Sequence, residues 1–163
     1  MVELRDFKKD DNSLLVQHLN NERVIQYLTS RIPYPFTVED ATWWIDIGSK
    51  EGITKAIEVR GKLVGVIGVS FGENQHSRCA EIGYWLGEEY WGQGIATNSV
   101  LQMTQYVFSN TEVVRLFAPV FDPNKASMNV LEKCGYKLEG ILEKRVYKNG
   151  EFFDEFLYAK VVS

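Results

Sequence analysis

The sequence predicts one α+β domain with a mixed β-sheet, and three observations support this class. Two pairs of predicted strands are joined by short turns, at Gly61-Lys62 and Asn149-Gly150, as in β-hairpins. Residues 94–110 and 125–134 have the pattern of helices placed between strands, which is typical of crossover connections. The sequence shows no linker, repeat or low-complexity segment, so we expect residues 1–163 to form a single domain.

The individual elements follow from local patterns along the chain. Val2, Leu4 and Phe7 are separated by polar residues, which predicts an opening strand. Thr37 with Asp40 resembles a capping box at the start of a helix. The full prediction is strand 2–7, helices 10–20 and 22–28, a proline-interrupted loop at 30–37, helix 37–50, strands 54–60, 63–71 and 80–86, helix 94–110, strand 113–120, helix 125–134, and strands 136–148 and 151–162.

Composition and charge argue against several classes of protein. A hydrophobic content of 45% is ordinary for a globular domain, and no stretch approaches the roughly 20 apolar residues that cross a bilayer. The net charge of −4 lacks the basic surplus of nucleic-acid-binding proteins; it suits a cationic acceptor such as an amine, or serves solubility alone. Glu3, Arg5 and Asp6 leave no visible signal peptide, so we expect a cytoplasmic protein without nucleic-acid or membrane partners.

The cysteines and histidines predict no metal site. Cys79 and Cys134 lie far apart and match no metal-ligand spacing, so we expect buried or half-buried thiols rather than a disulfide. His18 and His76 have no Cys, Asp or Glu at ligand spacing, and no arrangement of Ser or Cys with His and Asp suggests a nucleophile.

The segment from Leu86 to Thr97 is the first candidate binding site. It follows a predicted strand and opens the long helix, where the first backbone N–H groups have no partner within the helix. The helix dipole adds partial positive charge, and Gly92 and Gly94 carry no side chain that would keep a phosphate from the backbone. The glycine spacing matches neither the Walker motif nor the dinucleotide fingerprint. The pattern is typical of a pyrophosphate site or of a purely structural turn.

A second segment precedes the helix at 125–134. Asn124 is predicted to cap this helix and Gly135 to follow its end. Ser127 shares a helix face with Leu131 and Cys134. Asn124 and Ser127 therefore either contact a ligand or only stabilise the first turn.

Taken together, these segments resemble the GNAT acetyltransferases, most closely the RimJ/RimL-type branch, which includes N-terminal acetyltransferases of ribosomal proteins. The resemblance spans nearly the whole chain, and several motifs in order are more specific than any one of them. The motifs are Leu4-Arg5, Glu81-Ile82-Gly83-Tyr84-Trp85-Leu86, Trp91-Gly92-Gln93-Gly94-Ile95-Ala96-Thr97, Asn124-Lys125-Ala126-Ser127, Leu131-Glu132-Lys133-Cys134-Gly135-Tyr136 and Tyr147-Lys148-Asn149-Gly150.

The resemblance implies a GNAT fold, with a mixed, mostly antiparallel sheet that is splayed at its centre and covered by helices on both faces. It implies acetyl-CoA as co-substrate, with the pantetheine arm in the split between strands 81–86 and 113–120. The implied cofactor-binding residues are Trp85, Leu86, Gly92, Gln93, Gly94, Ile95, Ala96, Thr97 and Asn124. Ser127 matches a residue proposed, in some members, to protonate the leaving thiolate.

Three positions depart from patterns found in the family. Trp91 stands where Gln or Arg is common, although close relatives accept aromatic residues there. Leu131 replaces the Tyr that gives a proton in many members, and Val146 replaces a Glu base found in some ribosomal-protein acetyltransferases. Glu81 begins the strand expected to carry the acyl group and is therefore our candidate catalytic base; a surface role at the strand end is the alternative.

The acceptor is expected to be a primary amine, with a protein or peptide N-terminus of the ribosomal-protein-alanine type as the leading hypothesis. The alternatives are a small amine, such as a polyamine, amino sugar or antibiotic, and a non-catalytic acetyl-CoA-binding module. Tyr147 and Asp154 either line the acceptor pocket or make structural hydrogen bonds. The aromatic residues Tyr34, Phe36, Trp43 and Trp44 either shape that pocket or join the core. The chain is expected to be a monomer or a homodimer.

Overall fold

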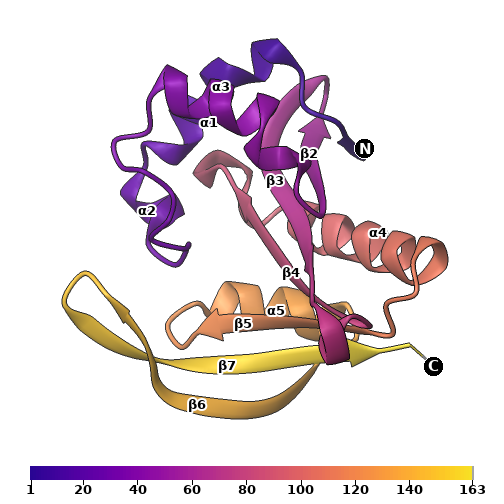
Figure 1. Ribbon diagram of the computed structural model, residues 1–163. Helices are drawn as coiled ribbons and strands as arrows, with labels where there is room; N and C mark the ends of the chain where they lie inside the picture. The colour runs from indigo at the N-terminus through magenta and orange to yellow at the C-terminus, as the bar shows by residue number, and fades with distance from the viewer. Residues whose placement is uncertain (163) are drawn as a thin grey trace.

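Seven strands form one continuous sheet in the computed structural model, which describes residues 1–162 (Figure 1). The strand order is β1-β2-β3-β4-β5-β7-β6, and all neighbours are antiparallel except the parallel pair β4 and β5. The predicted mixed, mostly antiparallel sheet is therefore confirmed. The strands are β1 (Val2–Arg5), β2 (Ile53–Val59), β3 (Lys62–Phe71), β4 (Cys79–Leu86), β5 (Arg115–Phe121), β6 (Lys137–Lys148) and β7 (Glu151–Val161).

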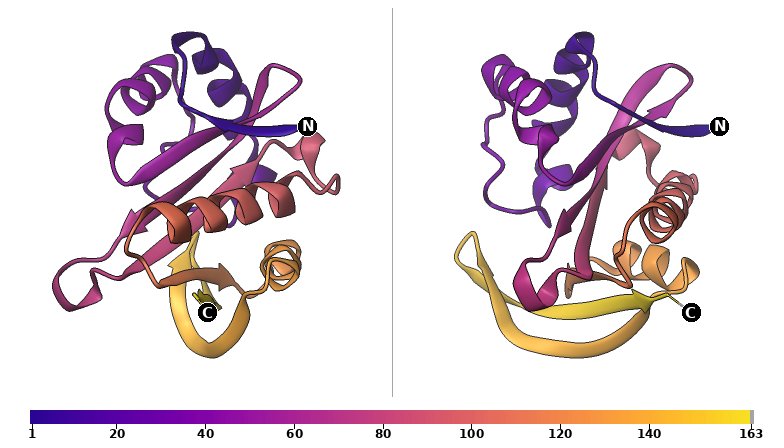
Figure 2. Two further views of the ribbon diagram at one scale, coloured as in Figure 1. Left: turned by 90° about the vertical axis from the view of Figure 1, so that its right-hand side faces the viewer. Right: turned by 45° about the vertical axis from the view of Figure 1, so that its right-hand side comes forward.

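Helices cover both faces of this sheet. Figure 2 shows α4 and α5 together on one face, whereas α1, α2 and α3 gather on the other side, above β2 and β3. The α-helices are α1 (Asn12–Leu19), α2 (Glu22–Ile25), α3 (Val38–Asp46), α4 (Ile95–Asn110) and α5 (Lys125–Lys133), and short 3-10 turns lie at Lys9–Asp11, Gly48–Lys50, Asn74–His76 and Glu88–Tyr90.

Each face of the sheet has its own hydrophobic core. On β3, Leu63 packs with the α1 and α3 side, while its neighbour Val64 packs with the α4 and α5 side. Both side chains are fully buried, because successive residues of a strand point to opposite faces. Two cores hold the centre of the sheet, so the residues that β4 presents are firmly positioned.

The sheet opens at its centre, between β4 and β5. The parallel pairing of these strands is limited to Cys79–Glu81 against Arg115–Phe117, yet β4 continues to Leu86 and β5 to Phe121. Figure 1 shows the two strands diverging beyond this short paired segment. The expected central splay is confirmed, and it leaves one edge of each strand without a strand partner.

Both predicted hairpins form, with one turn shifted in register. Asn149 and Gly150 have φ values of 53° and 80°, which suit the type I′ turn expected from this pair. The turn between β2 and β3 consists of Arg60 and Gly61, with φ values of 53° and 78°, rather than the predicted Gly61-Lys62. The shift arises because a type I′ turn needs two central residues with positive φ.

Several other elements are shorter than predicted. The opening strand predicted over residues 2–7 ends at Arg5, and the helix predicted over residues 10–20 spans Asn12–Leu19 after a 3-10 turn. The helix predicted to reach residue 50 ends at Asp46, because Ile47 leaves helical geometry with a φ of −127°. The helix predicted over residues 22–28 ends at Ile25, and the strand predicted from residue 113 begins at Arg115.

The predicted caps form as expected. The Thr37 hydroxyl accepts a hydrogen bond from the Asp40 N–H at 3.1 Å, and the Asp40 carboxylate accepts one from the Thr37 N–H at 2.8 Å. Asn124 caps α5, and Gly135 follows that helix with a φ of 87°. Both cysteines carry free thiols, with Cys134 buried and Cys79 half-buried, as predicted.

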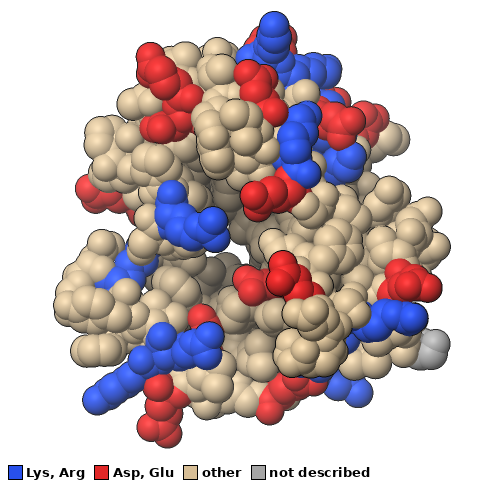
Figure 3. Space-filling view, viewed as in Figure 1, with Lys and Arg blue, Asp and Glu red and all other residues tan. Residues whose placement is uncertain are grey.

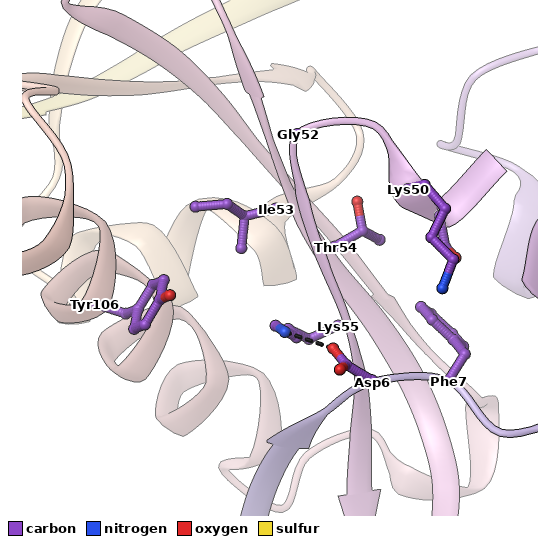
Figure 4. A pocket seen from close by; sticks show the side chains of 9 residues that line it. Asp6, Phe7, Lys50, Gly52, Ile53, Thr54, Lys55 and Tyr106 are labelled. Atoms are coloured by element: carbon purple, nitrogen blue, oxygen red, sulfur yellow. Dashed lines mark hydrogen bonds and ion pairs between the residues drawn. The ribbon is translucent and has the colours of Figure 1, made fainter. Parts of the chain in front are cut away.

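A polar pocket lies away from the splay, between β2 and the end of α4 (Figure 4). An ion pair of 2.6 Å between Lys55 Nζ and the Asp6 carboxylate crosses it, so its charges partly compensate each other. The side chains around it are Asp6, Phe7, Ser49, Lys50, Gly52, Ile53, Thr54, Lys55 and Tyr106.

Residues 1–162 contain neither a candidate membrane-spanning helix nor a cluster of metal ligands. No helix there has the length and apolar character needed to span a bilayer. No group of three or more His, Cys, Asp or Glu side chains is placed to hold a metal ion.

Candidate functional site

The edge of β4 that faces the splay carries main-chain groups directed into the gap. The Gly87 N–H donates to Val64 O on β3 at 2.8 Å, and Cys79 O accepts from the Gly72 N–H at 2.9 Å. In an antiparallel pair, the N–H and C=O of one residue point toward the same neighbouring strand, and those of the next residue point the opposite way. The main-chain groups of the odd-numbered residues of β4 therefore point toward β3. The even-numbered residues Ile82, Tyr84 and Leu86 therefore turn their main chain toward the gap, where an extended ligand can pair with them.

The glycine turn at the end of this gap presents a row of free amides. From Gly92 to Thr97, no backbone N–H donates a hydrogen bond to any residue of the described chain 1–162. Gly92 and Gly94 adopt φ values of 72° and 79°, and a side chain added at either would meet no atom within 4 Å. The space over these amides is open, so the turn fits the predicted pyrophosphate at the start of α4.

Side chains next to the glycine turn support it through hydrogen bonds, an ion pair and a cation–π contact. Trp91 Nε1 donates to Leu86 O at 3.0 Å, and Gln93 Nε2 donates to Glu89 O at 3.0 Å. Arg23 pairs with Glu88 at 2.6 Å and lies over the Trp91 ring, 5.7 Å from its centroid. Trp91 thus anchors the turn through its indole N–H while the main-chain amides stay available.

The side chain of Leu86 is buried and that of Trp85 is half-buried, at two positions that were predicted to bind the cofactor. Trp85 packs with the α1 core and meets the buried His18 edge-on, with ring centroids 6.3 Å apart. Burial lowers the pKa of His18, which favours a neutral ring beneath the turn. Leu86 is only 7% exposed, so it offers a ligand mainly its main chain.

Ser127 lies on the α5 side of the splay and contacts a residue that the sequence analysis missed. Its N–H donates to Asn124 Oδ1 at 3.3 Å, and its Oγ lies 2.8 Å from the hydroxyl of Tyr84 on β4. Burial raises the pKa of Tyr84 to about 12, so the phenol stays protonated at physiological pH. Because side chains alternate along a strand, Tyr84 lies with Ile82 on the face covered by α4 and α5. This alternation was readable from the sequence and could have identified Tyr84.

Glu81 occupies the opposite face of β4, at the last residue paired with β5. Its side chain keeps exposed surface, yet burial raises its pKa, and the nearby charge of Glu155 raises that pKa further. The Glu81 carboxylate is therefore accessible to solvent yet partly shielded by its neighbours. A raised pKa moves a carboxylate toward the range of a useful general base.

A hollow on this face separates the helices α1–α3 from the β5, β7 and β6 part of the sheet (Figure 3). Lysine and arginine side chains and acidic side chains both lie around its rim. One end is bridged by Lys148, whose Nζ donates to Ile25 O at 2.7 Å and Leu28 O at 2.6 Å. This bridge joins the β6–β7 hairpin to the end of α2, so the hollow is bounded on that side.

A cluster of aromatic rings lies on the same side of the sheet as Glu155. Tyr27 meets Phe121 edge-on at a centroid distance of 6.3 Å, and Phe121 stacks on Phe153 at 6.1 Å. Phe121 and Glu155 are register partners on β5 and β7, so both face the same side of the sheet. The sequence does not reveal this cluster, because its members come together only through strand pairing.

Tyr147 and Asp154, predicted either to line the acceptor pocket or to make structural hydrogen bonds, lie on the β6–β7 hairpin. Tyr147 is 65% exposed and packs against Phe152 at a centroid distance of 4.8 Å, on the outside of the hairpin. The Asp154 carboxylate accepts from the Lys144 N–H at 2.9 Å and supports a bulge in β6.

The four aromatic residues around the proline-rich loop divide into two groups. Phe36 and Trp44 join the α1 and α3 core, as expected for at least two of them. Tyr34 and Trp43 are exposed.

The splayed sheet, the free amides at the start of α4 and the half-buried hydroxyl pair form one candidate site beside the gap between β4 and β5. The sequence profile of the family "Acetyltransferase (GNAT) domain" matches residues 2–137. The chain therefore belongs to the GNAT acetyltransferase family, which confirms the predicted class.

Individual relatives agree with this assignment. The uncharacterised N-acetyltransferase YoaA of Bacillus subtilis is 38% identical over 69% of this chain and 64% of its own length. The ribosomal-protein-serine acetyltransferase of Escherichia coli is 32% identical over 62% of this chain and 56% of its own. The chain thus spans less than two thirds of either relative.

A solved structure extends the likeness to the whole fold. RimL, a ribosomal L7/L12 α-N-protein acetyltransferase in complex with coenzyme A, is 26% identical, with a TM-score of 0.84. The match covers 99% of this chain and 94% of RimL. The expected RimJ/RimL-type resemblance is confirmed.

Proposed function

We propose that the protein transfers the acetyl group of acetyl-CoA to the α-amine of a protein or peptide N-terminus. The observation that supports acetyl transfer is that a candidate acid and a candidate base lie on opposite faces of the splayed strand β4. Ser127 contacts Tyr84 on the α5 face, and Glu81 lies on the other face, at the vertex of the gap. A thioester in the gap would meet a hydroxyl donor on one side and a carboxylate on the other.

The residues of this chain would share the reaction as follows. The amides of Gly92 to Thr97 hold the pyrophosphate, and the free edge of β4 holds the arm of the donor. Glu81 takes a proton from the amine, directly or through water, so that the nitrogen can attack the thioester carbon. As the C–S bond breaks, its electron pair moves to sulfur, and Ser127 donates a hydrogen bond or proton to the thiolate.

The acceptor assignment rests on the shape of the hollow and on the named relatives. The Lys148 bridge closes the end of the hollow nearest the hairpin. It leaves less room for an acceptor polypeptide that extends on both sides of the residue carrying the reacting amine. A chain end needs to leave in only one direction. The E. coli relative acetylates a ribosomal protein by name, in agreement with this hypothesis.

A small polyamine is the second candidate acceptor. Glu81 and Glu155 place two carboxylates near each other on the acceptor face, and such a pair suits an amine with more than one positive charge. A spermidine N(1)-acetyltransferase is among the relatives, at 26% identity over 93% of this chain.

An acetyl-CoA consumption screen separates these functions. We expect peptides with free N-termini to give kcat/KM values at least about tenfold above those of spermidine and an aminoglycoside, a difference of roughly 1.4 kcal/mol. The same peptides with blocked N-termini are the matched control. The reverse order would assign a small amine, and binding of acetyl-CoA without turnover on any amine would indicate a non-catalytic module.

Replacing Ser127 by alanine should lower kcat roughly tenfold, in the lower range for acid catalysis, while the Kd of acetyl-CoA changes much less. The reason is that Leu131, fully buried in the core, supplies no hydroxyl at the position used by many relatives. Steady-state kinetics at saturating acceptor measure the effect. Ser109, an exposed serine near the end of α4, provides the control variant Ser109→Ala. An unchanged kcat in Ser127→Ala would leave Ser127 only a role at the start of the helix.

A further inference from the structure

We infer that Tyr84 is a positioning residue that directs the Ser127 hydroxyl toward the leaving sulfur of coenzyme A. This inference rests on the proposed function of Ser127 and extends it to a residue on the facing strand. Tyr84 lies on β4 past Glu81, where β5 has already diverged, and Ser127 lies in the first turn of α5. Their oxygen atoms are 2.8 Å apart, so this hydrogen bond joins β4 to α5 beside the gap.

The surroundings of the two hydroxyl groups leave them open to a third atom. Both side chains are half-buried, so each retains some accessible surface. The Ser127 main chain is fixed separately, since its N–H donates to Asn124 Oδ1. With its main chain fixed, the Ser127 hydroxyl can form hydrogen bonds only with nearby groups. The Tyr84 hydroxyl is the side-chain group to which it is bonded.

The direction of the hydrogen bond follows from the chemistry of the two groups. A phenol is a stronger acid than an aliphatic alcohol, so the Tyr84 O–H donates and Ser127 Oγ accepts. A hydroxyl has one hydrogen to give, and accepting from Tyr84 leaves the Ser127 hydrogen free for the sulfur. Hydrogen bonds in such a chain polarise one another, which makes Ser127 a better donor than it would be alone.

The proton balance of the step closes without any further reactant. The amine nitrogen forms a bond to the acetyl carbon and loses one proton to Glu81 or water, while the sulfur receives the electron pair of the broken C–S bond. The Ser127 proton neutralises the thiolate, the Tyr84 proton follows to Ser127 Oγ, and water returns a proton to Tyr84. The proton taken from the amine is released to the solvent and replaces the one that water gave, so the net change is transfer of one proton from nitrogen to sulfur. No oxidant or reductant takes part.

A titration of bound coenzyme A tests the inference without any acceptor. Hydrogen bonds to the thiolate favour the charged form and lower the pKa of the thiol. We expect the thiol of CoA on the wild-type protein, followed by ultraviolet absorbance of the thiolate, to titrate about one pH unit lower than on Tyr84→Phe, which corresponds to 1.36 kcal/mol. Complexes with desulfo-CoA supply the blank for ionisation of tyrosines.

A double-mutant cycle tests whether Tyr84 acts through Ser127. Tyr84→Phe should lower kcat between about threefold and tenfold with little change in acceptor KM, and Tyr84→Phe/Ser127→Ala should be no slower than Ser127→Ala alone. The matched control is Tyr136→Phe, because Tyr136 makes a similar hydroxyl pair with Thr104 at 2.7 Å, within the core. Tyr136→Phe should change neither the thiol pKa nor kcat.

Two results would overturn the inference. An equal thiol pKa on wild-type and Tyr84→Phe proteins would show that Tyr84 does not direct Ser127 toward the sulfur. Kinetic effects that multiply in the double variant would show that the two residues act independently. If no amine is acetylated but the thiol pKa still depends on both residues, the proposed acceptor function fails while the pairing of Tyr84 with Ser127 stands.

Discussion

Replacing Glu81 by glutamine is expected to lower kcat/KM by about a hundredfold or more for spermidine, the low end of the range for general base catalysis. Glutamine keeps the shape of the side chain but cannot take a proton, so the Kd of acetyl-CoA should stay the same. An α-amino group has a pKa near 8 and is partly neutral at physiological pH, whereas polyamine nitrogens are more basic. The loss should therefore be smaller for an N-terminal peptide than for spermidine.

The pH dependence of kcat/KM identifies the group that acts as base. Burial and the charge of Glu155 both raise the pKa of Glu81. The rate should therefore rise with pH as Glu81 loses its proton, at a pH above the ordinary range of a glutamate. Glu155→Gln removes the repelling charge, lowers the pKa of Glu81 and should move this rise to lower pH. Glu143, an exposed residue of β6, provides the control variant Glu143→Gln, which should not move it.

A near-wild-type rate of Glu81→Gln on an N-terminal peptide would exclude Glu81 as the base for that acceptor. The transfer reaction itself would stand, with solvent taking the proton.

Replacing Gly94 by valine is expected to weaken acetyl-CoA binding at least tenfold, roughly 1.4 kcal/mol. Gly94 has a φ of 79°, a conformation that a β-branched residue rarely adopts, so the turn would have to shift its amides. A valine side chain would also occupy the open space over the turn, where the phosphates would approach. Isothermal titration calorimetry with CoA measures the affinity, and circular dichroism checks that the variant is folded.

The control for Gly94→Val separates backbone strain from loss of the site. Gly61 has a φ of 78°, and a side chain added there also meets no atom within 4 Å, but it lies in the β2–β3 turn. Gly61→Val should therefore cost stability through the same strain while leaving CoA affinity unchanged. Unchanged affinity in a folded Gly94→Val protein would contradict the assignment of these amides to the pyrophosphate.

Signals that act over a few residues were readable from the sequence. The Thr37–Asp40 capping box, the Asn124 cap and the Asn149-Gly150 turn are each decided by backbone and side-chain chemistry within a short segment. The glycine turn before α4 belongs to this group, because the first N–H groups of any helix lack intrahelical partners. Local patterns also placed the start of α4 to within one residue and gave the order of the elements along the chain correctly.

Other features needed the tertiary structure, because they depend on strand register and on contacts between distant segments. The extent of the splay is set by where β4 and β5 stop pairing, which no local pattern encodes. Tyr84 and Ser127 are 43 positions apart, and Lys148 lies 120 or more positions from the carbonyl groups it binds.

The sequence by itself determined the family, the order of the elements along the chain and the position of the glycine turn before α4, since these follow from short segments with defined geometry. Only the tertiary structure placed Glu81 near Glu155, paired Tyr84 with Ser127 and showed the contacts that Tyr147 and Asp154 make within the β6–β7 hairpin. The physical reason is that a one-residue change of register turns every side chain of a strand to the other face. The environment of each catalytic candidate is therefore decided by the assembled sheet.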